Sequence, residues 1–332
     1  MGIKGLNKYF KMNVSDKAIH QHSISELRGK TVVIDTSIYM YKFLEDGMLF
    51  ENMFAFISQC VEYDVTPLFV FDGKPHDMKY EVCMTRYKKR VQASEKYKDA
   101  QEQYALQSKV MTPEEKGHWV HKMADYKKKA IRVKGKYIDI LKEMMDAMGV
   151  FYCDAPNEAD VVCACYVRQG IAWACVSDDM DMFAYGCPRV LREWNVQKAS
   201  VMLYDLEAIQ EEFRIPEIHL REVLLLVGND YTKTRLSMDT VMEWYRRFET
   251  DVTTLLFVPW LVKRGYITKA MGQKWQTISS LYDEAEETVL EMVLEKENAT
   301  PSLSQRVCAK PTEIQWEKLQ SILMPYGFVF IV

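Results

Sequence analysis

Three carboxylates stand within four positions of the stretch CVSDDMDMF, at Asp178, Asp179 and Asp181. The segment before them, IAWACV, predicts a buried strand, and apolar residues follow them as well. Unpaired charges beside a core strand would repel one another and lose hydration. A positive group is therefore expected there, and hard divalent cations are the usual partners of clustered carboxylate oxygens.

Four further apolar runs end in an acidic residue or are followed by one: TVVID, PLFVFD, VFYCD and LLLVG. These acids are Asp35, Asp72, Glu158, Asp160 and Asp230. A single aspartate at a strand end more often caps a helix or shapes a turn. Asp154 can be explained as shaping its loop, and Asp178 as a surface neighbour of the other acids. Because all four predicted strands lead to an acid, a shared site explains the pattern better than capping does.

The carboxyl ends of parallel strands lie at one edge of a sheet, where ligands bind in α/β proteins. We therefore expect seven carboxylates to meet there and to bind two Mg²⁺ ions, which Mn²⁺ can replace. Two ions about 4 Å apart promote in-line displacement at phosphorus, so the predicted substrate is a phosphodiester. The expected metal ligands are Asp35, Asp72, Glu158, Asp160, Asp179, Asp181 and Asp230.

A basic segment offers a complementary surface for such a substrate. Residues 74–142 contain 18 Lys and Arg against 9 Asp and Glu, although the whole chain has a net charge of −4. Lys79, Arg86 and Arg90 are spaced to share one face of a helix. We assign Lys79 and Arg86 to the scissile phosphate as catalytic residues. Further candidates for nucleic-acid contact, for which a solvated surface is an equal alternative, are Lys88, Lys89 and Arg90.

Strands that alternate with helices must position these residues. The predicted strands are apolar and lack polar alternation, which indicates a parallel sheet covered on both faces. They lie at 31–35, 67–72, 150–154 and 171–178. We predict an α/β fold with a twisted, mostly parallel sheet flanked by helices. Residues 78–135 predict a helical hairpin whose turn carries the capping sequence TPEE, and helices dominate beyond about residue 205.

The amino-acid composition limits the class of protein and the cellular compartment that can be expected. The 332 residues are 48% hydrophobic, which is enough for a large core, and they contain no membrane-length apolar run and no secretory signal. The eight cysteines form no C-x-x-C pair and mostly lie in apolar segments, which indicates reduced thiols. We expect an intracellular monomer of the nucleus or cytoplasm that is not bound to a membrane.

Six motifs, in this order, resemble the flap endonuclease, or XPG-type, family of structure-specific 5′ nucleases. They are MGIKGL, VVIDTSIYMYKFL, PLFVFDGKP, DAPNEAD, SDDMDMFAYG and LLLVGNDY, and they span most of residues 1–231. The resemblance implies a PIN-like nuclease in which the hairpin forms an arch over two metal ions held by the seven carboxylates. We therefore predict a nuclease core over 1–248 with the arch inserted at about 74–135, and a helical C-terminal region over 249–332 that packs on the core.

The resemblance also implies roles for single residues. Lys79 and Arg86 fall on the basic catalytic positions of the arch. Tyr41 falls on the residue that stacks near the scissile nucleotide, although a tyrosine on an apolar helix more often belongs to the core. Gly2 matches the N-terminal glycine that lies beside the active site once Met1 is removed.

The sequence departs from the family pattern at three places. Asp160 replaces a glutamate, and its shorter side chain would move one metal ion. No glycine occurs between Gly228 and Gly265, where the family has a glycine-containing motif that binds duplex DNA and potassium. This weakens the expectation of duplex binding, of a potassium ion and of a flap preference. The chain ends in FVFIV without a basic tail or sliding-clamp motif, as expected of a compact member such as a viral one, which would act at a cytoplasmic replication site.

These observations favour a Mg²⁺-dependent 5′ nuclease that acts on flapped, nicked or 5′-ended DNA in replication, repair or recombination. An RNA nuclease of the same fold, active in mRNA degradation, is an alternative that matched DNA and RNA flaps would distinguish. A non-catalytic scaffold that binds DNA junctions is a third hypothesis, which the complete carboxylate set disfavours. A D-x-D phosphatase is a weaker competitor, because VVIDTS lacks the second aspartate.

Overall fold

The computed structural model describes residues 2–74, 79–229, 231, 234, 236–251, 255–308 and 314–329. Within these residues the strands are β1 (Ile19–Ser23), β2 (Thr31–Asp35), β3 (Thr66–Phe71), β4 (Phe151–Asp154), β5 (Ala174–Val176), β6 (Arg189–Asn195) and β7 (Ser200–Asp205). They form one sheet in the order β1-β7-β6-β5-β2-β3-β4. β2 pairs in parallel with β3 and β5, β3 with β4, and β5 with β6, whereas β7 is antiparallel to β6 and β1. The predicted α/β fold with a mostly parallel sheet is confirmed.

The sheet separates two apolar layers, and alternate residues of β2 point into each. Val33 belongs to one layer and Val32 and Ile34 to the other, and all three are fully buried. The layer around Val33 includes α1 (Leu6–Asn13), α7 (Ala159–Arg168), α8 (Leu206–Phe213), α9 (Glu217–Val227), α10 (Met238–Thr250), α11 (Phe257–Arg264), α12 (Lys269–Asn298) and α13 (Leu303–Cys308). The other layer includes α2 (Thr36–Glu45), α3 (Leu49–Glu62), α6 (Gly135–Ala147), α14 (Trp316–Leu323) and the 3₁₀ turn η1 (Ile24–Leu27).

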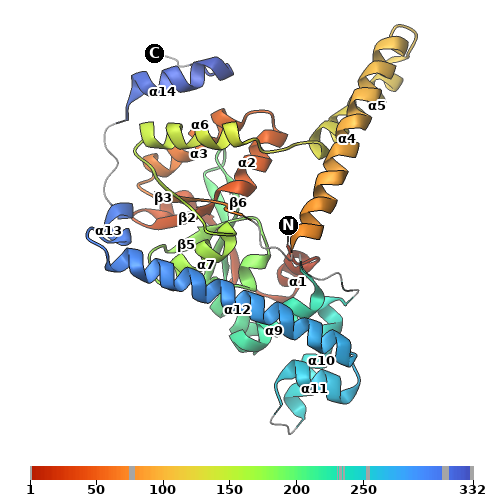
Figure 1. Cartoon of the computed structure of the whole chain (residues 1–332), viewed down its shortest axis with the longest axis vertical. Helices are drawn as coiled ribbons and strands as arrows, with labels where there is room; N and C mark the ends of the chain where they lie inside the picture. The colour runs from red at the N-terminus through yellow and green to blue at the C-terminus, as the bar shows by residue number, and fades with distance from the viewer. Residues whose placement is uncertain are drawn as a thin grey trace.

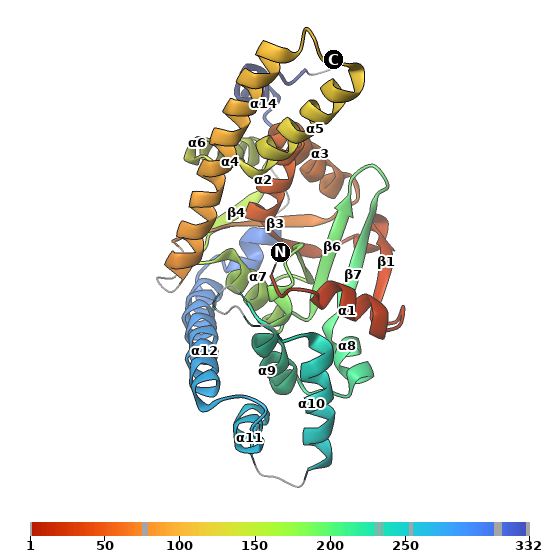
Figure 2. The same cartoon turned by 90° about the vertical axis from the view of Figure 1, so that its right-hand side faces the viewer.

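The basic segment forms the predicted helical hairpin, called the arch below: α4 (Tyr80–Gln107) and α5 (Pro113–Lys129). Thr112 and Glu115 make the capping box expected from TPEE, and Pro113 begins α5. The arch extends away from the end of the protein that carries α10 and α11 (Figures 1 and 2). Its only buried residues are Ala93 and Ala100 of α4, within the part of the arch that is described.

The C-terminal helices share the core with the sheet. Tyr282 and Val289 of α12 belong to the same apolar layer as α7, along which α12 runs (Figure 1). The boundary expected at residue 248 falls inside α10, and the apolar layer continues across it. Further along the chain, α14 packs on α6 in the opposite layer, where Gln315 N donates to Ala147 O at 2.9 Å.

Three strands were not predicted from the sequence, and β5 is shorter than the predicted 171–178. β1, β6 and β7 lie on the side of the sheet that contains the antiparallel pairs, and they include polar residues such as Gln21 and Glu193. Polar positions are expected there because antiparallel strands need not be buried on both faces. None of the helices in the described ranges is both long and apolar enough to cross a bilayer.

Candidate active site

Four carboxylates from separate elements meet at the carboxyl edge of the sheet. Asp35 ends β2, Asp72 follows β3, Asp160 lies in the first turn of α7, and Asp179 follows β5. Burial, and then repulsion from Asp72 and Asp179, raises the pKa of Asp35 to about 7. Burial, and then the carboxylates of Asp35 and Asp179, raises the pKa of Asp160 well above its ordinary value. Asp35 and Asp160 thus each lie close enough to Asp72 and Asp179 for the negative charges to oppose their ionisation.

Ser177 connects two of these acids through hydrogen bonds. Its Oγ donates to Asp35 Oδ2 at 3.2 Å and accepts from Asp179 N at 3.2 Å. In turn, Asp179 Oδ1 accepts from Asp181 N at 3.0 Å, where the 3₁₀ turn η3 (Asp181–Phe183) begins. The loop after β5 therefore folds around its own carboxylates, which limits the directions in which they can point.

The end of β3 is joined closely to the start of α7. Asp72 Oδ1 accepts from Ala159 N at 2.8 Å, and Gly73 N donates to Asn157 O at 2.6 Å. A Cβ atom at Gly73 would lie 2.2 Å from Ala155 O, which is closer than a side chain can approach. Gly73 thus allows the contact that brings Asp72 next to the first turn of α7.

Gly2 lies against the acidic loop. It has a φ of +77°, and a Cβ atom there would lie 2.0 Å from Asp179 Oδ1 and 2.6 Å from Asp181 Oδ1. A larger residue would have to displace one of these carboxylates, and the positive φ also favours glycine. The structure therefore places Gly2 beside the acidic site.

Lys79 immediately precedes α4, and its side chain is 8% exposed. Its Nζ lies 2.7 Å from Glu158 Oε2, at the start of α7, and 4.8 Å from the ring centre of Tyr231. Burial alone would lower the pKa of Lys79, but Glu158 and Tyr231 outweigh it and raise the pKa above its ordinary value. Lys79 is thus a fixed positive charge at the border of the carboxylates.

The arch also contacts α2. The guanidinium carbon of Arg90 lies 5.0 Å from the ring centre of the half-buried Tyr41, and Lys128 of α5 pairs with Glu45 at 2.7 Å. Lys79 and Arg90 therefore occupy different surroundings, although the sequence spacing put them on one helical face. The basic residues of α4 that the structure leaves exposed to solvent include Arg86, Lys88 and Lys89.

Two acids mentioned above make contacts outside this group of carboxylates. The carboxylate of Asp178 accepts from Glu193 N at 2.8 Å and lies 3.4 Å from Lys42 Nζ. Asp154 pairs with Lys142 at 2.6 Å. Both carboxylates thus have local partners of their own, in an ion pair and a hydrogen bond to β6. Asp230 lies outside the described residues.

Two models of one protein family match this chain. The XPG N-terminal domain matches residues 1–93, and the XPG I-region matches residues 149–230. The chain belongs to the XPG family. Both matched segments contain acids of the site, with Asp35 and Asp72 in the first and Asp160 and Asp179 in the second.

A curated relative and two solved structures are similar to this chain. Flap endonuclease 1 of Xenopus tropicalis is 28% identical over 252 residues, which are 70% of this chain and 62% of that protein. The match thus spans less than two thirds of that curated relative. The catalytic core of Rad2 in complex with a DNA substrate has a TM-score of 0.59 at 18% identity, covering 98% of this chain and 96% of that one. GEN1 in complex with product DNA and Mg²⁺ has a TM-score of 0.54 at 17% identity, covering 98% and 73%. The predicted PIN-like fold is confirmed.

Ser177 and Gly73 were not predicted as site residues of this XPG-family chain. Gly73 could have been found, because it directly follows Asp72 in FDGKP, where a strand ends and a tight approach is needed. The bond from Asp179 N to Ser177 is local, but the link from Ser177 to Asp35 carried no such signal, because it depends on the fold that brings β2 and β5 together.

The donor chemistry of the site fits a hard divalent cation. The clustered donors are carboxylate oxygens, and a cation would relieve the repulsion that raises the pKa values of Asp35 and Asp160. Across the described residues, no three His, Cys, Asp or Glu side chains already form a metal-ligand arrangement. The carboxylates would therefore have to rotate toward a bound ion.

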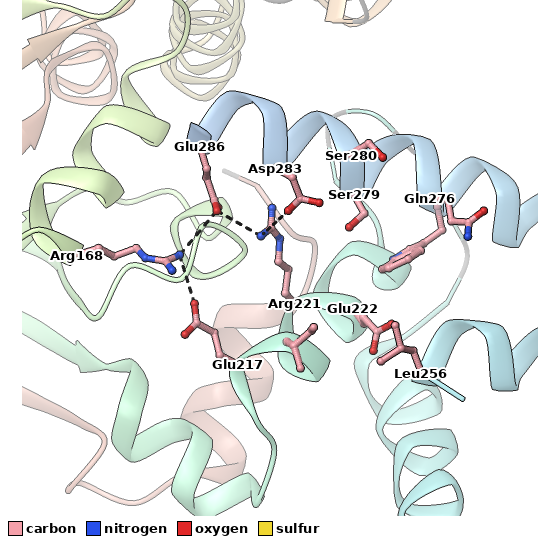
Figure 3. Close-up of a pocket in the computed structure, with 12 residues that line it drawn as sticks. Arg168, Glu217, Arg221, Glu222, Leu256, Gln276, Ser279, Ser280, Asp283 and Glu286 are labelled. Atoms are coloured by element: carbon pink, nitrogen blue, oxygen red, sulfur yellow. Dashed lines mark hydrogen bonds and ion pairs between the residues drawn. The ribbon is translucent and has the colours of Figure 1, made fainter. Parts of the chain in front are cut away.

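A separate cavity of about 750 Å³ lies near Arg168, at the opposite end of α7 from Glu158 (Figure 3). Arg168 pairs with Glu217 at 3.3 Å, and Arg221 pairs with Asp283 at 3.2 Å. These contacts connect α7, α9 and α12. Each guanidinium has carboxylate partners. The charged residues that line this cavity are therefore explained by ion pairs that hold the three helices together.

Proposed function

We propose that this protein is a Mg²⁺-dependent, structure-specific 5′ nuclease that hydrolyses phosphodiester bonds in flapped, nicked or 5′-ended DNA. The observation that supports it most is the meeting of four repelling carboxylates from separate elements, with Lys79 at their border. Such a group has no structural advantage without a cation, since its carboxylates repel one another and the burial of Asp35 costs free energy. A phosphodiester substrate also accounts for the basic arch.

In this proposal Asp35, Asp72, Asp160 and Asp179 hold two Mg²⁺ ions, with Mn²⁺ able to replace them. The outer side of the metal site would be formed by Glu158, Asp181 and Asp230. When bound, such ions lower the pKa of a water molecule and stabilise charge on phosphate oxygens. The hydrogen bonds of Ser177 and Ala159 orient the carboxylates before any ion binds.

The chain's own cations then act on the substrate. Lys79 remains charged at working pH because its pKa lies above the ordinary value, and it would hold a non-bridging oxygen of the scissile phosphate. Arg86 would assist from about two turns further along the arch, while Tyr41 would stack on the adjacent base. Gly2 allows the nucleotide to approach the acidic loop without a side chain in between.

DNA is the favoured substrate, because the similar Rad2 and GEN1 structures are complexes with DNA. The deciding experiment incubates end-labelled single-flap, nicked, gapped and single-stranded DNA with the protein, in Mg²⁺ and in EDTA. Matched RNA flaps are run in parallel. We expect Mg²⁺-dependent cleavage of flapped or nicked DNA that leaves a 5′-phosphate. Cleavage that persists in EDTA, or cleavage of RNA alone, would contradict the proposal.

The proposed activity also suggests where the protein works. A monomer with reduced thiols would act inside the cell, in whichever compartment contains its DNA, nucleus or cytoplasm. The mass of the active species in gel filtration, compared with 38.9 kDa for one chain, tests the monomer.

A further inference from the structure

Arg192 of β6 connects the acidic loop to the N-terminal helix. Its side chain is buried, and the residue is 6% exposed. Nη2 donates to the backbone oxygen of Asp178 at 2.8 Å, and Nη1 donates to Asn7 Oδ1 at 2.7 Å. One rigid guanidinium thus spans from α1 to the residue that precedes Asp179.

The neighbours of Arg192 hold it in one orientation. Asn7 Oδ1 also accepts from the hydroxyl of Tyr204 at 2.6 Å, and the guanidinium carbon lies 5.2 Å from the ring centre of Tyr204. The next residue, Glu193, donates its backbone N–H to the carboxylate of Asp178 at 2.8 Å. β6 therefore holds both the backbone and the side chain of Asp178.

The charge of Arg192 needs a reason beyond these hydrogen bonds. Both of its acceptors are neutral oxygens, and a buried guanidinium with neutral acceptors keeps much of its desolvation cost. The acidic loop that begins at Asp178 supplies nearby negative charge, since Asp179 and Asp181 follow within three positions. The bond to Asp178 O places this positive charge next to a loop whose carboxylates would otherwise only repel one another.

We propose that Arg192 is a positioning residue that fixes the Asp179–Asp181 loop against α1, and hence against Gly2, so that the carboxylates are arranged for metal binding. The inference rests on the proposed function. It assigns Arg192 no contact with metal or substrate. A lysine could keep the charge but could not present two N–H groups in the same planar geometry.

The test compares Arg192→Met and Arg192→Lys with Val190→Ala. Val190 is fully buried two residues away on the same strand, where it pairs with Cys175 and Tyr204 but makes none of the side-chain hydrogen bonds of Arg192, so its variant controls for general destabilisation of β6. Mn²⁺ affinity is measured by titration without DNA, and hydrogen exchange of residues 178–182 is measured in EDTA. Arg192→Lys keeps the test decisive if Arg192→Met does not fold.

We expect Arg192→Met to weaken Mn²⁺ binding about 10- to 100-fold, the usual effect of removing a group that orients metal ligands. We also expect faster exchange at Asp179 and Asp181, with Arg192→Lys in between and Val190→Ala close to the parent. Unchanged affinity and exchange in both Arg192 variants would overturn the proposal, as would an equal loss in Val190→Ala.

The two readouts separate this inference from the proposed function. A parent protein that binds no Mn²⁺ would refute the metal-dependent nuclease. The exchange measured in EDTA would still decide the role of Arg192, because faster exchange confined to residues 178–182 supports positioning and unchanged exchange overturns it.

Discussion

The acidic edge of the sheet and the basic arch would meet the same substrate, but they are stabilised in different ways. Asp35 is 4% exposed and ends a strand whose apolar residues are fully buried on both faces. The arch has two buried alanines in α4 and no buried residue in the described part of α5. The edge is therefore held by the core, whereas the arch depends on pairwise contacts at its base and with α2. Substitutions at the acidic edge should lower the rate of phosphodiester cleavage. Substitutions in the arch should change how substrates are bound.

The largest effect is expected at the acidic edge. Asp179→Ala should lower cleavage of a flapped DNA by at least about 10³-fold, the scale of removing one preorganised electrostatic group. Binding of the same DNA, measured by fluorescence anisotropy, should change far less, because the arch is untouched. Rates are measured under single-turnover conditions in Mg²⁺.

Asp154→Ala is the matched control for this variant. Asp154 also stands at the end of a parallel strand, but it pairs with Lys142 away from the site. Its replacement should leave cleavage close to that of the parent. Substantial activity in Asp179→Ala, or an equal loss in Asp154→Ala, would remove the distinction between the acidic edge and its surroundings.

A smaller effect is expected where the two regions join. Lys79→Met should lower kcat about 10²-fold with a lesser change in KM, because a fixed charge beside the phosphate acts mainly on the transition state. The substitution also leaves Glu158 without this cation, so some loss of stability should accompany it. Lys142→Met removes an ion pair of similar length at Asp154 and serves as the control. Equal kcat values for the two variants would count against a catalytic Lys79.

The acidic edge should also show a characteristic pH dependence without metal. The pKa of Asp35, about 7 in the folded protein, lies above its unfolded value of about 3.9, so folding favours the protonated form. The stability that this group contributes is fully present when the pH is below the pKa of Asp35 in the unfolded state. It is lost as the pH rises through about 7, the pKa in the folded state. The Tm in EDTA should therefore fall between pH 5.5 and pH 8 through this group.

Mg²⁺ should oppose that loss, because the ion competes with the proton for the same carboxylates. The rise in Tm on adding Mg²⁺ should be larger at pH 8 than at pH 5.5, as measured by scanning calorimetry. Asp35→Asn should reduce this difference. An equal rise in Tm on adding Mg²⁺ at both pH values would show that the ions do not bind at carboxyl groups that gain a proton in this pH range.

The smallest effect is expected in the arch. Arg90→Ala removes the contact with the half-buried Tyr41 and should raise KM for flapped DNA a few-fold, since a cation–π pair at the protein surface contributes about 0.5–1 kcal/mol. The Tm should hardly change. Lys98→Ala, an exposed lysine of the same helix, is the control. A large drop in Tm for Arg90→Ala would mean that the arch is part of the core after all.

The sequence was sufficient for elements whose signals are local. TVVID and PLFVF predicted central strands because continuous apolar runs need burial on both faces, and TPEE predicted the turn of the arch through its capping chemistry. The meeting of Asp35, Asp72, Asp160 and Asp179 followed from a topological rule, since parallel strands end at one edge.

Contacts between distant residues could not be predicted in this way. Helical spacing put Lys79 on one face with Arg86 and Arg90, but the structure places it before α4, against Glu158. Arg192 lies in RVLREWN, a segment without a clear period that was not predicted to be a strand. Its partner Asn7 belongs to another element, so only the assembled fold reveals the pair.

The link between Arg192 and Asn7 joins residues 185 positions apart in the chain. During synthesis, a nascent chain on the ribosome could not complete the acidic site until its first helix met a strand translated much later. A potentially destructive hydrolase would thus stay inert while still incomplete. Translation itself would time the appearance of its activity.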